Sequence, residues 1–264
     1  MQTHLKVRPT LDHFLKSSAV LRGIPILAAA IYLFSWPNNG VTVLAYHKVS
    51  NAPSIYSIDP DLFERQMSYL AGNGYSSISL PYLAEALAGK TPLPDKSIII
   101  TFDDGYEDNY LTALPIMEKY GMRAAVFIAV DKVSQPGYMS WDQINAMQAK
   151  GVDIGSHSMS HPALTDISPS EQTKEILASK KALEKHLNRP VNFIAYPYGK
   201  FNPEMFNLLR QVGYRGAFSG ISGLNFPGDN PYTLKRISIL SPKFDIWSFQ
   251  FRLIRTMISS KLGL

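Results

Sequence analysis

The sequence predicts an α/β fold, specifically a distorted (β/α)7-8 barrel. From residue 40 onward, short apolar runs typical of strands alternate with segments typical of helices. This alternation favours parallel strands joined by crossover helices. Seven or eight such units favour a closed barrel over an open sheet, and in such barrels the residues that do chemistry gather where strands end.

Each strand and helix can be predicted in order along the chain. Strands are expected at residues 41–46, 76–80, 97–102, 123–130, 152–156, 192–196, 214–219 and 234–239. Helices are expected at residues 61–71, 83–88, 108–120, 141–150, 170–187 and 204–212. Ser140 with Gln143 and Ser168 with Glu171 form capping boxes, which mark two of the helix starts.

Composition limits the class of protein. The chain has 264 residues, of which 45% are hydrophobic and 18% charged, enough for one well-packed domain with a short appendage. It has no cysteine and therefore no disulfide framework. Of the net charge of +5, residues 1–36 and 243–264 each carry +3. A nucleic-acid-binding protein more often carries its basic residues on the folded domain, so we expect no nucleic-acid partner.

Residues 23–36, GIPILAAAIYLFSW, form a charge-free apolar run behind a basic segment. A membrane span needs about 20 residues, and counting back to residue 17 supplies them. No small-residue cleavage site follows, so residues 1–38 are expected to be a basic tail and uncleaved signal anchor. Residues 39–264 would then be the catalytic domain, membrane-anchored outside the cytoplasm, or secreted if cleavage occurs. A helix packed on the domain is the alternative.

One predicted strand ends at two adjacent carboxylates, Asp103 and Asp104, in the sequence TFDDG. Neighbouring side chains on an extended chain point to opposite sides, so the two carboxylates are expected to have different partners. One could bind a metal while the other faces a bound water. The alternative is an ordinary turn, in which Asp and Gly are common.

Two histidines follow another short strand, in the sequence HSMSH. His157 and His161 are four residues apart, so one helical turn would place both imidazoles on one face. Two histidines and one carboxylate suit zinc and leave a coordination position for water, although cobalt, nickel and manganese accept the same set. A chance pair on a solvated helix is the alternative.

Together, TFDDG, HSMSH and AYPYG at residues 195–199 resemble, in order, the three motifs of the polysaccharide deacetylase family, the NodB homology domain. Similarity extends from LAYHKVS at residue 44 to RISI at residue 236, and YHKV most resembles the poly-N-acetylglucosamine deacetylase branch. The resemblance implies a metal-dependent hydrolase that removes N-acetyl groups from a carbohydrate polymer. That polymer would be poly-β-1,6-N-acetylglucosamine, a biofilm exopolysaccharide, or a related glycan. Peptidoglycan and chitin-like oligomers are alternatives.

The resemblance also implies a role for each motif residue. The metal ligands would be Asp104, His157 and His161. Asp103 would be the general base. Ser158 is expected to be a hydrogen-bond donor that stabilises its loop, not a reactant. The oxyanion site would comprise Pro197, Tyr198 and Gly199, with the backbone N–H of Tyr198 as the donor.

Two residues of the family pattern are missing. Ala195 stands where an arginine often neighbours the catalytic aspartate, and no histidine follows His186 to supply the late Leu-x-His general acid. Arg236 could restore the charge beside Asp103. His47, at the end of the first strand, could supply the proton. Otherwise the chain would be a catalytically impaired carbohydrate-binding relative.

An apolar stripe recurs at three- and four-residue spacing near the C-terminus. Its members are Phe244, Trp247, Phe251, Ile254 and Ile258. The spacing is typical of an amphipathic helix, and we expect the stripe to pack on the barrel instead of entering a membrane.

Overall fold

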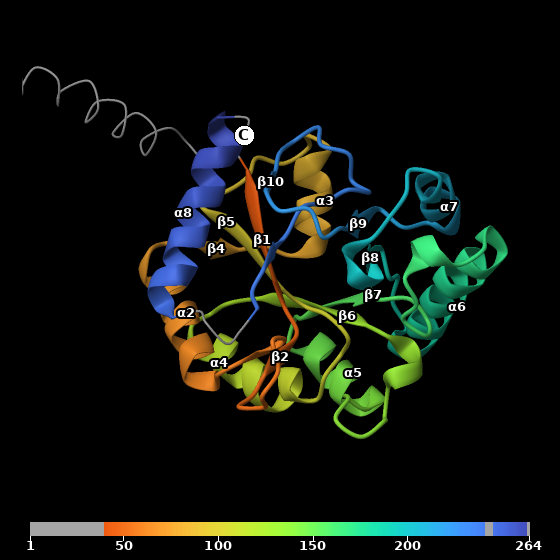
Figure 1. The fold of residues 1–264 in the computed structure, drawn as a ribbon, viewed down its shortest axis with the longest axis horizontal. Helices are drawn as coiled ribbons and strands as arrows, with labels where there is room; N and C mark the ends of the chain where they lie inside the picture. Colours follow the sequence, from red (N-terminus) through yellow and green to blue (C-terminus); the bar gives the residue numbers. More distant parts are fainter. Residues whose placement is uncertain (1–39, 241–244, 263–264) are drawn as a thin grey trace, which may run out of the picture. The chain divides into compact units, whose positions relative to one another are not determined.

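The computed structural model describes residues 40–240 and 245–262 (Figure 1). The predicted tail and anchor, residues 1–38, and Phe244 lie outside the described residues. No helix in the described ranges is long and apolar enough to cross a membrane.

Strands and helices alternate along the described chain, as predicted. The strands are β1 (Val41–Tyr46), β2 (Lys48–Val49), β3 (Ser57–Ile58), β4 (Ser76–Ser77), β5 (Ser97–Phe102), β6 (Ala124–Ile128), β7 (Asp153–Ser156), β8 (Phe193–Ala195), β9 (Gly216–Phe218), β10 (Leu224–Asn225) and β11 (Ile237–Ser238). The helices are α2 (Pro60–Gly72), α3 (Leu80–Leu87), α4 (Leu114–Lys119), α5 (Trp141–Ala149), α6 (Pro169–Leu187), α7 (Met205–Val212) and α8 (Ile246–Leu262). Both capping boxes are present.

The main sheet curls into a distorted barrel, which confirms the predicted fold class. Its strand order is β10-β1-β5-β6-β7-β8-β9, and the pairs from β1 to β9 are parallel. The segment before β11 joins the two sides, because Leu234 forms a bridge with Phe218 of β9 while β11 pairs with β1. The strand predicted at 234–239 is shorter because the N–H of Arg236 donates to the carbonyl of Ile221 in a loop.

Successive side chains of the strands point to opposite faces of the sheet, and this divides the core into two layers. Outward-facing side chains such as Leu44 and Ile100 belong to a cluster that includes residues of the surrounding helices. Inward-facing side chains such as Val43 and Ile99 form a second cluster, which includes residues of α3. Because inward positions recur every two residues, the inner face of β1 and β5 continues to His47 and Asp103 beyond the strand ends. The fold therefore directs these side chains toward one end of the barrel.

Candidate active site

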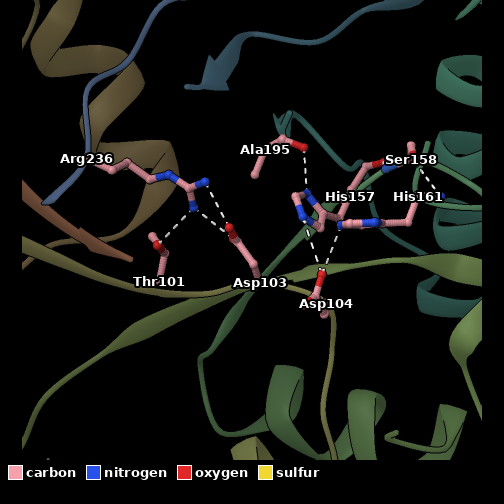
Figure 2. A network of polar contacts seen from close by, with 9 residues as sticks. Thr101, Asp103, Asp104, His157, Ser158, His161, Ala195 and Arg236 are labelled. Carbon is pink, nitrogen blue, oxygen red and sulfur yellow. Dashed lines mark hydrogen bonds and ion pairs between the residues drawn. The ribbon is translucent and has the colours of Figure 1, made fainter. Parts of the chain in front are cut away.

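A cavity of about 370 Å³ lies at the C-terminal ends of the parallel strands. The predicted site residues that line it are His47, Asp103, Asp104, His157, His161, Tyr198, Gly199 and Arg236. Figure 2 shows five of them converging from different strands. The remaining predicted residues, Pro197 and Ser158, are buried within the turns that carry the lining residues.

Asp104, His157 and His161 bring their ligand atoms to one place (Figure 2). Oδ1 of Asp104 lies 3.1 Å from Nε2 of His161 and 3.5 Å from Nε2 of His157. All three ligand atoms lie within 4.8 Å of one another, close enough to share one ion. Since carboxylate oxygen and neutral imidazole are common metal ligands, the predicted set converges on a possible metal site.

The ring of His157 is held in the tautomer that a metal ligand needs. Its Nδ1 lies 2.7 Å from the carbonyl oxygen of Ala195, which can only accept, so Nδ1 carries the proton. Burial lowers the pKa of His157 and favours the neutral ring. Nε2 then directs a lone pair toward the carboxylate of Asp104, an arrangement that is repulsive unless a cation lies between them. The residues therefore fit a bound metal.

The two histidines are not on a helix, so the predicted helical turn is wrong. Residues 157–161 form a loop after β7, in which Ser158 has φ 65° and His161 has φ 66°. Two residues in the left-handed region fold the chain back on itself, and this brings the imidazoles together. A four-residue spacing is compatible with either geometry, which is why the sequence could not separate them.

Side-chain hydrogen bonds hold this loop in place. Oγ of the fully buried Ser158 accepts a hydrogen bond from the backbone N–H of His161 at 3.0 Å, so Ser158 stabilises the loop as an acceptor and not as the predicted donor. The carboxylate of Glu175 on α6 accepts the N–H groups of Met159 and Ser160, each at 2.9 Å. Sequence analysis missed Glu175, because nothing in a helical pattern marks a residue whose partners lie in the preceding loop.

Asp103 forms a buried ion pair with Arg236 (Figure 2). Nη1 and Nη2 of Arg236 lie 2.7 and 2.8 Å from the two carboxylate oxygens, and each side chain is only 5% exposed. Burial alone would raise the pKa of Asp103, but the guanidinium more than offsets this and holds the pKa well below its ordinary range. Arg236 thus supplies the positive charge that the family pattern places at Ala195.

His47 reaches the same cavity, as predicted from its place at the end of β1. Its backbone carbonyl accepts a hydrogen bond from the side chain of Asn109 at 2.7 Å, and its ring lies 4.8 Å from that of Tyr56. The buried Nδ1 has no hydrogen-bond partner among the described residues. Since Nδ1 is inaccessible, a contact between His47 and a bound substrate would have to be made by the other ring nitrogen, Nε2.

Tyr198 lies in the short turn Pro197–Gly199 after β8. Its φ is 59°, and its ring lies 4.9 Å from that of His161. Gly199 has φ 68°, and an added Cβ would lie 2.5 Å from the backbone of Gly220, so only glycine is tolerated there. This turn places Tyr198, the predicted oxyanion donor, in the cavity lining with its ring beside His161.

A family model described as polysaccharide deacetylase matches residues 90–217, the region that contains TFDDG, HSMSH and AYPYG. The chain therefore contains a polysaccharide deacetylase (NodB) domain. Its predicted enzyme class, a carbohydrate N-deacetylase, is thereby confirmed.

This polysaccharide deacetylase is similar to proteins of known sequence and structure. It is 27% identical over 240 residues to poly-β-1,6-N-acetyl-D-glucosamine N-deacetylase of Staphylococcus aureus (strain MRSA252), with 80% of this chain and 82% of that protein covered. The structure of the Streptococcus pyogenes deacetylase PplD in complex with acetate matches with a TM-score of 0.74 at 28% identity, over 83% and 98% of the chains. The structure of IcaB from Ammonifex degensii matches with a TM-score of 0.70 at 28% identity, and the match covers 75% of this chain and 91% of that chain.

Proposed function

We propose that this polysaccharide deacetylase is metal-dependent and removes N-acetyl groups from poly-β-1,6-N-acetylglucosamine or a related cell-surface glycan. The observation that carries the proposal is the convergence of Asp104, His157 and His161 beside the buried pair of Asp103 and Arg236. The staphylococcal relative named for that polymer covers most of both chains, which supports it as the first substrate to test. Peptidoglycan and chitin-like oligomers are the comparison substrates.

Zinc is the proposed metal, because a carboxylate and two imidazoles suit it; cobalt, nickel and manganese accept the same ligands. When bound, a divalent cation lowers the pKa of water and polarises the acetyl carbonyl. The ligands would be Asp104, His157 and His161.

The remaining side chains would carry the proton transfers. Asp103, kept ionised by Arg236, would take a proton from the attacking water as the general base. The backbone N–H of Tyr198 would donate to the oxyanion that forms on the acetyl group. His47 would then donate a proton to the nitrogen as the C–N bond breaks, which releases acetate and a free amine. The Asp103–Arg236 contact and the position of His47 favour this enzyme over a carbohydrate-binding relative without turnover.

We also propose that residues 17–36 anchor the chain in a membrane and that the domain acts outside the cytoplasm. The apolar run and the basic residues before it support this placement. Full-length protein should sediment with membranes, whereas a chain that begins at Asn39 should be soluble and active. A mature N-terminus within the run would instead indicate cleavage and secretion.

The proposed activity is tested by acetate release from a β-1,6-linked N-acetylglucosamine pentamer, with and without a chelator, alongside β-1,4-linked oligomers. Chelation should abolish release, and added zinc should restore it. Asp103→Asn should keep its metal and lose about two to four orders of magnitude in rate. The matched control is Asp95→Asn, since Asp95 is exposed and outside the cavity. Loss of metal from Asp103→Asn would mean that the two aspartates have been assigned in reverse.

Two histidine variants distinguish the role of metal ligand from the role of general acid. His161→Ala should lose both metal and activity, with His186→Ala, an exposed residue of α6, as the control. His47→Ala should keep its metal, lose most of kcat and lose the alkaline limb of the pH profile. Normal metal content in His161→Ala would remove it from the ligand set, and an unchanged pH profile in His47→Ala would exclude the acid role.

A further inference from the structure

Helix α8 has two apolar faces, and only one of them packs on the domain. Phe249 and Leu253 are 1% and 2% exposed, and the ring of Phe249 lies 6.2 Å from that of Tyr69 on α2. Trp247 is 73% exposed and Phe251 is 65% exposed. The predicted packing of this stripe on the barrel is therefore wrong, because the helix docks through the opposite face. The sequence shows two apolar faces and cannot say which one the domain covers.

The exposed stripe runs along most of the helix. With 3.6 residues per turn, its exposed members share one side; they are Trp247, Phe251, Ile254 and Leu262, and the partly buried Ile258 lies on the same side. At 1.5 Å per residue the stripe is about 22 Å long. A tryptophan and a phenylalanine one turn apart on a surface helix indicate a contact with something apolar.

The charge of α8 points to the chemistry of that contact. From Ile246 to Leu262 the helix contains two arginines and one lysine but no acidic residue. Arg255 is exposed and follows the stripe residue Ile254 directly, whereas Arg252 is partly buried and donates to the carbonyl of Ser238 at 2.5 Å. A basic helix with an exposed aromatic and aliphatic face is typical of helices that lie in the surface of an anionic membrane.

The position of Gly40, the first described residue, supports a lipid as the occupant. Gly40 packs against Leu224 and Phe226, and the N–H of Leu224 donates to Oγ of Ser260 on α8 at 3.3 Å. Gly40 therefore lies near the C-terminal half of α8. Only three residues lie between Trp36 and Gly40, and the four steps from one to the other span at most about 14 Å. An anchor that ends at Trp36 would hold this end of α8 close to the lipid headgroups.

We propose that the Trp247–Phe251–Ile254 face of α8 lies in the surface of an anionic lipid membrane and orients the catalytic domain on it. The inference rests on the anchored placement proposed above. The other possible occupants, residues 17–36 folded onto the helix and a second copy of the chain, are outcomes of the test.

The test uses the full chain, which has three tryptophans, Trp36, Trp141 and Trp247. Three variants each keep one tryptophan and replace the other two by phenylalanine. Each is reconstituted in phosphatidylglycerol–phosphatidylcholine vesicles, with and without brominated acyl chains. We expect bromolipid to quench Trp247 and the vesicles to protect it from acrylamide. Trp141 is the internal control, because it stacks on His186 at 3.8 Å and its helix α5 lies away from α8 (Figure 1). Trp36 reports on the anchor.

Each outcome supports or refutes the lipid contact of α8. Quenching of Trp36 but not of Trp247 would refute the lipid contact of α8 and leave the anchor standing. A Trp36 that is not quenched would refute the anchor itself. Protection of Trp247 from acrylamide without lipid would show that protein covers the face, which also overturns the proposal. Phe251→Glu should lower the quenching of Trp247 at least about twofold. Ile55→Glu, at an exposed apolar residue outside α8, should leave the quenching unchanged.

Discussion

Arg236→Met tests how the site keeps Asp103 ionised. The substitution removes two hydrogen bonds of 2.7 and 2.8 Å to a carboxylate that is 5% exposed. Breaking a buried ion pair by removing one partner costs about 3–5 kcal/mol, because the other charge stays buried without compensation. For a domain of this size, that corresponds to a fall in Tm of about 6–20 °C.

The free energy of unfolding is measured by guanidinium denaturation at pH 7, with Lys150→Ala as the control. Lys150 pairs with Glu118 at 2.8 Å, but both side chains are nearly half exposed, so its loss should cost at most about 1 kcal/mol. Asp103→Asn combined with Arg236→Met should recover much of the loss, since no unpaired charge then remains.

The pH dependence gives a second check on the same pair. The folded-state pKa of Asp103 lies below its unfolded value, so the pair stabilises the protein fully above that unfolded value. The unfolded-state pKa is the same in both proteins, so the difference between parent and Arg236→Met should shrink as the pH falls from the raised folded-state pKa of the unpaired Asp103 in the variant toward its lowered pKa in the parent. The reasoning is refuted if Arg236→Met unfolds within 1 kcal/mol of the parent, about the cost of an exposed pair. A double variant as unstable as the sum of its single changes would also refute it.

Three further substitutions probe the loops around the site. Glu175→Gln weakens charge-assisted bonds to the histidine loop and should reduce metal affinity about 10–100-fold with the fold intact, as measured by titration with a competing chelator. Ser158→Ala leaves the N–H of His161 without its acceptor and should cost about 1–3 kcal/mol in the free energy of unfolding; a change near zero would mean that the loop rearranges. Gly199→Ala would force a Cβ to 2.5 Å from the backbone of Gly220, so acetate release should fall even where metal content stays normal.

The sequence determined the order of elements and most of the chemistry. Apolar runs with strand periodicity, together with capping residues, fixed where strands and helices form, because these signals act between near neighbours. The places of Asp103 and His47 at strand ends predicted that they would meet, since the C-terminal ends of parallel strands lie at one end of a barrel.

Tertiary structure decided what depends on contacts between distant segments. The histidine loop obtains its shape from φ angles at Ser158 and His161 and from Glu175 on the next helix, none of which a four-residue spacing reveals. The partner of Asp103 lies 133 residues away, so only the closure of the barrel at β11 could confirm Arg236. Which apolar face of α8 is covered depends on the surface it meets, because burial is a property of the packed molecule and not of the helix alone.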